Sequence, residues 1–368
     1  MNQGRFFGRI QLMLKKTKAF LKDKNKKNIF RIIKECIIIT LRLRCVPTHY
    51  FTGFVYRKNT ENYLDYLSMK EMLEVHSSSN IHTPEGFQVL DNKLLFHEHF
   101  SKHGLNIPKK LANNFQNLLF IEKKTGVKNI EIFSNEYFVT VIKNLFQETG
   151  CEAIFIKPIY SSGGHGAIRL SKGIFSSSQS KSLNKSFDSI INGFYIFQEN
   201  INQHPELSRI NASSLNTIRI DTFKSYQKKP EVISAYLRMG RSGKVVDNLM
   251  SGGIYAGIDI ISGKLHPIAF SKLETGGVVF SKHPDSGVEF KDFSITYFDK
   301  VKEMACEAAN LITEKLVGWD IAVSIDGPVL IEGNGNYEII YSDIAYGGYR
   351  RNPIFKKAMI EAGLKIIK

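Results

Sequence analysis

Acidic residues are almost missing from the start of this sequence of 368 residues. Residues 1–50 contain thirteen Lys and Arg residues and only two acids, Asp23 and Glu35. The whole chain carries a formal net charge of +15, so most of the excess lies in this segment. Such a segment favours contact with an anionic surface. No groove-reading motif accompanies it, so we expect no nucleic-acid partner.

Cysteine and long apolar runs are also scarce. The four cysteines are far apart and form no CxxC or Cys/His metal spacing, which is typical of reduced packing residues in a cytosolic protein. The longest apolar stretch, residues 29–46, is interrupted by five charged residues, so we do not expect it to span a membrane. We therefore expect a cytoplasmic protein, and a position at the inner face of the membrane is a further hypothesis.

Apolar residues recur at helical spacing within the basic segment, at Phe6, Ile10, Met13, Leu14 and Leu21. This spacing predicts an amphipathic helix with its lysines opposite the apolar stripe. Three interpretations stay open for residues 1–50. The helix makes a peripheral contact with an anionic membrane, it packs on the main body, or it is a transit peptide.

Two common nucleotide-binding signatures, GxxxxGK[ST] and GxGxxG, are absent. Instead, the stretch IKPIYSSGGHGAIRL, residues 156–170, leads from Lys157 on a predicted strand into a loop rich in serine and glycine. Loops of this kind let backbone amides approach a phosphate group closely. A surface hairpin is the alternative interpretation.

The rest of the pattern mixes strands and helices without regular alternation, which favours α+β lobes. We predict a Ser-rich exposed connection at residues 176–186 and a strand pair around the turn Asp326-Gly327. Helices are predicted within residues 90–108 and 297–316, and strands at residues 153–157, 167–170, 193–201, 216–223, 232–239, 319–325 and 328–332.

Oxygen donors gather around that strand pair, in WDIAVSIDGPVLIEGNGN, residues 319–336. Asp320 lies on the first strand. Glu332 and Asn334 lie two residues apart on the second, so an extended chain puts them on one face. Two carboxylates and an amide suit Mg²⁺ that is held mainly through substrate phosphates. Such a trio also arises by chance, but together with Lys157 and the glycine loop it indicates a triphosphate site.

The order of these motifs resembles that of ATP-grasp enzymes over roughly residues 60–345, and is most similar to the sugar-transfer-associated group of that superfamily. The resemblance implies an α+β ATP-grasp fold, in which two subdomains grip ATP, with a small α/β pre-grasp region and a basic helical N-terminal arm. The implied segments are the arm (1–50), the pre-grasp region (51–130), the first lobe with the glycine-rich loop (131–200) and the second lobe with the magnesium site (201–368).

The same resemblance implies ATP and Mg²⁺ as cofactors and assigns roles to residues. Lys93 and Lys157 match the two phosphate lysines, FQENI (residues 197–201) matches the hinge strand that holds adenine, and Glu206 matches the acid that binds ribose. The implied nucleotide set is Lys93, Lys157, Ser161, Ser162, Gly163, Gly164, His165, Gly166, Gln198, Glu199, Ile201 and Glu206. The implied metal ligands are Asp320, Glu332 and Asn334.

Two arginines complete the expected site. Arg219 and Arg238 lie in blocks that resemble the narrower group, and are expected to contact the γ-phosphate and the acceptor carboxylate, in an order that stays open. Residues 337–351, which contain several Tyr and Arg residues, suit either substrate recognition or a subunit contact.

The activity that the resemblance implies is an ATP-dependent carboxylate–amine ligase acting through an acyl phosphate. Its expected substrates are a sugar derivative such as a uronic acid and an amino acid or amine, in cell-surface polysaccharide biosynthesis. Two alternatives stay open. One is a nucleotide-binding accessory protein of a membrane-associated glycosyltransferase complex, and the other is a kinase-like member that stops at a phosphorylated product.

Overall fold

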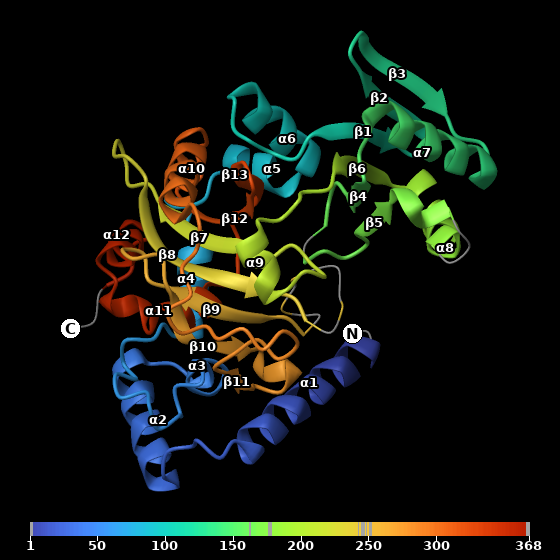
Figure 1. The fold of residues 1–368 in the computed structure, drawn as a ribbon. Helices are drawn as coiled ribbons and strands as arrows, with labels where there is room; N and C mark the ends of the chain where they lie inside the picture. Colours follow the sequence, from blue (N-terminus) through green and yellow to red (C-terminus); the bar gives the residue numbers. More distant parts are fainter. Residues whose placement is uncertain are drawn as a thin grey trace. The chain divides into compact units, whose positions relative to one another are not determined.

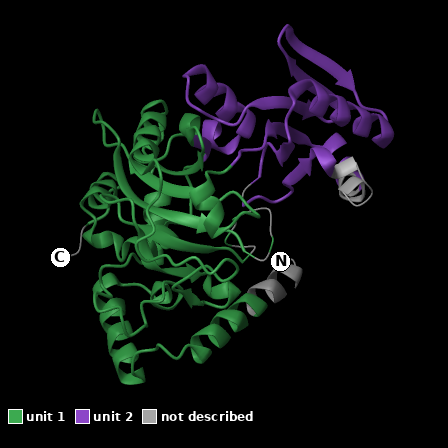
Figure 2. Cartoon of the chain, in the orientation of Figure 1, with its two compact units in different colours: residues 1–87, 203–328, 333–368 green, residues 88–202, 329–332 purple. Residues whose placement is uncertain are grey.

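The computed structural model describes residues 3–161, 163–175, 179–241, 243, 247, 249 and 252–365. The chain forms two compact units, which Figure 2 colours separately. Unit 1 comprises residues 1–87, 203–328 and 333–368, and unit 2 comprises residues 88–202 and 329–332. The four segments expected from the sequence stay a prediction.

Unit 2 contains a six-stranded sheet in the order β3-β2-β1-β6-β4-β5 (Figure 1). Its strands are β1 (Lys110–Phe115), β2 (Leu118–Lys123), β3 (Gly126–Glu131), β4 (Ala153–Pro158), β5 (Ile168–Ser171) and β6 (Phe194–Glu199). All neighbouring strands run antiparallel. The helices of this region are α5 (Pro84–Asp91), which begins in unit 1, α6 (Lys93–Lys102), α7 (Asn135–Thr149) and α8 (Gln179–Ile191).

Helix α7 covers the core of unit 2. It begins after Ser134, whose hydroxyl accepts a hydrogen bond from the Tyr137 N–H at 3.2 Å, as expected of an N-cap. Its buried residues recur every three or four positions, at Phe138, Ile142 and Leu145, and pack with apolar side chains of β4 and β6. Lys157 and Gln198 of the same strands are not part of this apolar core and belong to the site described below.

Unit 1 contains a seven-stranded sheet in the order β11-β10-β9-β8-β7-β12-β13. Its strands are β7 (Ile218–Phe223), β8 (Glu231–Met239), β9 (Ile254–Ile258), β10 (Leu265–Ser271), β11 (Val279–Phe280), β12 (Leu316–Ser324) and β13 (Gly327–Asn334). Its helices are α1 (Gln3–Lys22), α2 (Ile29–Leu43), α3 (Thr48–Thr52), α4 (Met69–Ser77), α9 (Pro205–Ile210), α10 (Phe298–Asn310), α11 (Ile339–Tyr346) and α12 (Pro353–Glu361). Trp319, on β12, is fully buried, and its Nε1 donates to the Thr222 hydroxyl at 2.8 Å.

The predicted α+β class is confirmed by these two sheets and their helices. The predicted hairpin turn is also confirmed, since β12 ends at Ser324 and β13 begins at Gly327, whose φ is 122°. The exposed connection expected at residues 176–186 is wrong where the structure describes it, because α8 begins at Gln179. Apolar residues at helical spacing, such as Phe187 and Ile190, pack on the core of unit 2 and outweigh the serine content.

The basic segment forms two helices, α1 and α2, that belong to unit 1. Phe20 of α1 makes edge contacts with Phe51 and Tyr56, and Lys16 pairs with Glu274 at 2.8 Å. The predicted packing on the main body is therefore present for part of α1. No helix in the described part of the chain has both the length and the apolar content that a membrane span requires.

We predict that His49, on α3, makes unit 1 sensitive to acid. Burial lowers the pKa of His49 from 6.5 to about 4, and neither ring nitrogen has a hydrogen-bond partner among the described residues. Between these two pKa values the unfolded chain binds the proton more readily, so stability falls as pH decreases through this window. Between pH 7 and pH 5, the free energy of unfolding should therefore fall by about 2 kcal/mol less in His49→Leu than in the wild type.

Urea unfolding followed by the fluorescence of Trp319 measures this difference, because Trp319 reports on the same unit. The exposed Leu73 of the same unit provides a control, since Leu73→Ala changes no titratable group and should keep the acid sensitivity of the wild type. Equal sensitivity in the wild type and in His49→Leu would mean that another group causes it.

Candidate functional site

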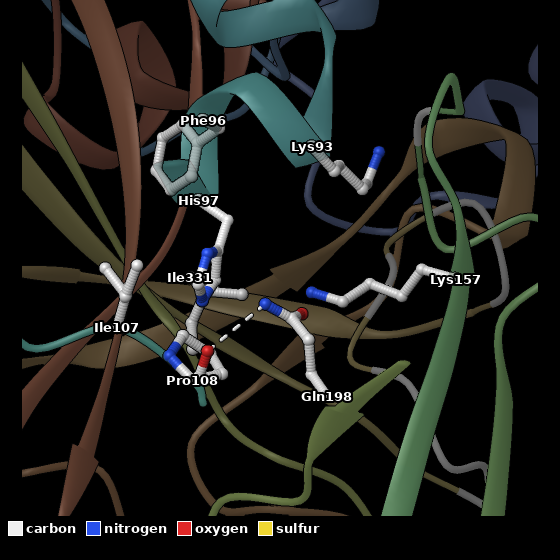
Figure 3. Close-up of a pocket in the computed structure, with 8 residues that line it drawn as sticks. All are labelled: Lys93, Phe96, His97, Ile107, Pro108, Lys157, Gln198 and Ile331. Atoms are coloured by element: carbon white, nitrogen blue, oxygen red, sulfur yellow. Dashed lines mark hydrogen bonds between the residues drawn. The ribbon is translucent and has the colours of Figure 1, made fainter. Parts of the chain in front are cut away.

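Lys157 and Gln198 lie on one face of the unit 2 sheet. Lys157 follows Phe155 by two positions on β4, and Phe155 pairs with Gln198 on β6, so the three side chains share a face. Figure 3 shows the ends of Lys157 and Gln198 turned toward a common space. This small pocket is lined by Lys93, Phe96, His97, Ile107, Pro108, Lys157, Gln198 and Ile331, all of unit 2. It therefore combines an apolar wall with two ammonium groups.

Gln198 is the buried polar group of this pocket. Its Nε2 donates to the carbonyl oxygen of Pro108 at 3.4 Å, while its Oε1 is buried without a hydrogen-bond partner in the described structure. A buried acceptor without a donor costs free energy, so this position favours a ligand that brings an N–H group. Burial lowers the pKa of the neighbouring His97, which is therefore neutral at pH 7.

The glycine loop begins where the structure brings two predicted residues together. Lys93, in the first turn of α6, donates from Nζ to the carbonyl oxygen of Ser161 and lies 3.5 Å from its hydroxyl. Gly163, Gly164 and Gly166 have φ angles of 64°, 71° and 73°. Residues with a Cβ rarely adopt this left-handed region, so the backbone of the loop requires its glycines.

The other residues of the predicted nucleotide set are more scattered. His165 is exposed in the loop, Glu199 is exposed at the end of β6, and Ile201 follows it, partly buried. Glu206 lies in unit 1 on α9, where its exposed carboxylate pairs with an arginine three residues on, at 2.8 Å. Ser162 lies outside the described residues.

In unit 1, Asp320 forms a buried ion cluster with Arg219 and Arg238. Arg219 on β7 stands opposite Asp320 on β12, and its Nε and Nη2 donate to the two carboxylate oxygens at 2.7 and 3.0 Å. Arg238 on β8 donates from Nη1 to the same carboxylate at 2.7 Å. The side chain of Asp320 is only 3% exposed. The structure thus joins both predicted catalytic arginines to one predicted metal ligand.

Asp247 extends the cluster, although no sequence motif marks it. Arg238 donates from Nη2 to its carboxylate at 3.3 Å, and the Thr217 N–H donates to the same side chain at 3.1 Å. Burial raises the pKa of Asp247. Burial alone would lower the pKa of Arg219, but the Asp320 carboxylate raises it well above its ordinary value. Both arginines are therefore permanently charged and held in position.

The predicted metal ligands supply the hard oxygen donors that Mg²⁺ prefers. Asn334 is partly buried at the end of β13, and Glu332 lies two residues before it, in the stretch that groups with unit 2. Among the described residues, no three His, Cys, Asp or Glu side chains form a metal-binding group. The three metal assignments stay predictions.

Tyrosines of the segment 337–351 are mostly part of the core rather than a ligand surface. Tyr341 and Tyr349 are 8% and 0% exposed, and the Tyr349 hydroxyl donates to Asp221 at 2.8 Å. Burial raises the pKa of Asp221 to about 6. Arg350 pairs with Glu71 at 2.5 Å. Most of the tyrosines of this segment therefore pack in the core of unit 1.

We predict that Gly318, next to the ion cluster on β12, does not tolerate a larger residue. A Cβ at this position would lie 3.0 Å from Tyr337 Cγ and 3.1 Å from Arg219 Cδ. Overpacking of this kind costs about 1–3 kcal/mol, so Gly318→Val should lower the free energy of unfolding of unit 1 by that amount. Urea unfolding followed by Trp319 fluorescence measures it.

Gly173, in unit 2, provides the control for this substitution when unfolding is also followed by circular dichroism, because a Cβ there would meet no atom within 4 Å. We expect Gly173→Val to change stability by less than about 0.5 kcal/mol. An unchanged free energy of unfolding in Gly318→Val would show that the packing around Arg219 is looser than the distances indicate.

The chain belongs to the sugar-transfer associated ATP-grasp family, whose model matches residues 76–352. The resemblance predicted from the motifs is therefore confirmed, and the match covers every residue of the predicted site. Among curated proteins, none matches this sequence.

Several solved structures are distantly similar to the chain. The ATP-grasp ligase PsnB, solved with a minimal precursor, Mg and ADP, is 13% identical, with a TM-score of 0.39 over 76% of this chain and 61% of PsnB. Biotin carboxylase from Campylobacter jejuni is 11% identical, with a TM-score of 0.46 over 77% and 48%. D-alanyl-alanine synthetase A from Vibrio cholerae O1 is 10% identical, with a TM-score of 0.43 over 76% and 66%. The chain spans less than two thirds of each, so these likenesses support no conclusion on its substrate.

Proposed function

We propose that this protein is an ATP-dependent carboxylate–amine ligase that uses Mg²⁺ and forms a C–N bond through an acyl phosphate. The observation that carries the proposal is the unit 2 pocket, with Lys93, Lys157 and the unpartnered Gln198 acceptor, in a chain that belongs to an ATP-grasp family. Each part of that pocket suits one part of ATP.

The nucleotide would use the pocket as follows. An exocyclic amino group of adenine would donate to Gln198 Oε1, which burial has left without a donor in the described structure. The ammonium groups of Lys93 and Lys157 would offset phosphate charge, and the left-handed glycines of the neighbouring loop would let backbone amides approach the terminal phosphates. Lys93 on α6, Lys157 on β4 and Gln198 on β6 all line this one pocket, which supports the assignment.

The reaction needs positioning and charge rather than a protein nucleophile. A carboxylate oxygen of the substrate attacks the γ-phosphorus, the bond to the β-phosphate oxygen breaks, and ADP leaves. An amine then attacks the acyl carbon and displaces inorganic phosphate, losing one proton. Arg219 and Arg238 would offset negative charge as it moves, because Asp320 holds both guanidinium groups in fixed positions. Bound Mg²⁺, with Asp320, Glu332 and Asn334 as proposed ligands, would supply further charge stabilisation.

The proposed substrates are a sugar derivative that carries a carboxylate, such as a uronic acid, and an amino acid or amine, in cell-surface polysaccharide biosynthesis. The support for the sugar is the description of the family as sugar-transfer associated. The support for the ligation is the pocket and the ion cluster, which contain the parts needed to activate a carboxylate.

The test is release of ADP from ATP and Mg²⁺ with pools of uronic acids and amino acids, each pool tried alone and together. The ligase is expected to release ADP fastest when both pools are present, and to yield a product whose mass equals carboxylate plus amine minus water. Tight ATP binding with no ADP release in any mixture would instead favour the accessory-protein alternative. A stable phosphorylated product would favour the kinase-like alternative.

A further inference from the structure

Helix α2 is apolar on two opposite faces. Its inner face buries Ile32, Ile39 and Leu43 in the core of unit 1. Its outer face carries a second set of large apolar side chains at spacings of three and four residues, which form one stripe along the helix. This outer stripe comprises Phe30, Ile33, Ile37 and Leu41, which are 78%, 51%, 54% and 72% exposed.

The outer stripe is not explained by the packing of unit 1. Nothing in the part of the chain that the structure describes covers it, and a helix that only packs on a core has polar residues on its outer face. A contiguous exposed apolar patch of this kind marks an interaction surface. The charges around the stripe indicate which class of partner it binds.

Both acids of residues 1–50 are used internally. Glu35 accepts hydrogen bonds from Lys27 Nζ at 2.7 Å and from the Tyr50 hydroxyl at 2.7 Å, at the buried side of α2. Asp23 accepts from Arg57 Nε at 2.7 Å. The acids therefore do not offset the charge on the outer surface of the segment.

The exposed charges that α2 itself carries beside the outer stripe are positive. Lys34 and Arg42 of α2 and Arg44, which follows it, are exposed. Helix α1, dark blue in Figure 1 and part of the same unit, adds exposed Met13 and Leu14 among its lysines. The outer surface of α2 thus presents apolar side chains with basic residues of the same helix beside them.

We propose that the outer stripe of α2 docks on an anionic lipid bilayer. Phe30, Ile37 and Leu41 would enter the boundary between headgroups and acyl chains, and the basic residues beside the stripe would contact lipid phosphates. A second copy of the chain fits less well, because a two-fold contact through this stripe would place like charges opposite one another. The proposal does not depend on the ligase activity.

The test is flotation of the full chain with vesicles of phosphatidylcholine, alone or with about 30% phosphatidylglycerol. We expect binding to the anionic vesicles only, and loss of that binding at about 0.5 M salt. The variant Phe30→Ser/Leu41→Ser removes two exposed side chains and should weaken binding about tenfold or more. Lys34→Gln/Arg42→Gln should weaken it as well, and should also reduce its dependence on salt.

Ile261 provides the matched control, because it is 87% exposed on the same unit but lies away from the basic segment in the sequence. Ile261→Ser should bind vesicles as the wild type does. Circular dichroism and nucleotide binding should be unchanged in all variants, which shows that they fold. The proposal is wrong if the stripe variant binds anionic vesicles as tightly as the wild type. It is also wrong if the full chain does not bind vesicles but forms a dimer by light scattering, and the stripe variant is a monomer.

Discussion

Asp320→Asn should lower the free energy of unfolding of unit 1 by about 3–5 kcal/mol. The substitution keeps the shape of the side chain but removes the charge that Arg219 and Arg238 share, and both guanidinium groups are largely buried. A buried charge that loses its partner keeps its desolvation cost without compensation. Urea unfolding followed by the fluorescence of Trp319, the neighbouring residue on β12, measures the loss directly.

Two further variants separate the ion cluster from general damage to the hairpin. Asp326→Asn, in the exposed turn after β12, should change stability by less than about 0.5 kcal/mol. Adding Arg219→Gln to Asp320→Asn should recover part of the loss, because Arg219 is the cation that loses its ion pair, whereas Arg238 keeps its pair with Asp247. If Asp320→Asn is as stable as the wild type, the ion cluster is not formed in solution.

Lys157→Met should weaken the binding of ATP by about 10- to 100-fold. The ammonium group of Lys157 lies in the unit 2 pocket beside Gln198, and a hydrogen bond to a charged group contributes about 1.5–3 kcal/mol. Methionine keeps most of the volume of the side chain, so the pocket should retain its shape. Titration calorimetry with Mg²⁺ and a non-hydrolysable ATP analogue measures the affinity without turnover.

The control for this prediction is Lys172→Met in the same unit. Lys172 is exposed, and its ammonium group pairs with an exposed carboxylate, that of Glu152, at 3.7 Å. Its loss should leave the affinity for the nucleotide unchanged. Equal affinities of the Lys157 and Lys172 variants would remove Lys157 from the nucleotide site.

Much of the fold could be predicted from local pattern. The strand that ends at Lys157 is short, β-branched and followed by glycines, and the hairpin at Asp326-Gly327 has a strong turn signal, so both were expected correctly. Helix α8 was not predicted, because the serine content of residues 176–186 favours a loop. Its apolar residues stabilise a helix only through their packing on the core of unit 2.

The ion cluster could not be predicted in the same way. Arg219 meets Asp320 because β7 and β12 pair in one particular register, and residues about a hundred positions apart give no local sign of that register. Asp247 follows β8 and pairs with Arg238, and no motif in the sequence predicts this contact either. The outer stripe of α2 escaped notice for a related reason, since a helix that is apolar on two faces looks like any interrupted apolar run.

Trapping the activated carboxylate tests most directly whether the protein forms an acyl phosphate. The full chain is incubated with ATP, Mg²⁺, hydroxylamine and one carboxylate at a time, without an amine substrate. We expect a hydroxamate that forms only with ATP and with one class of carboxylate, together with one ADP for each hydroxamate. ADP release without a hydroxamate for any carboxylate that stimulates it would contradict an acyl phosphate, and with it the proposed ligase.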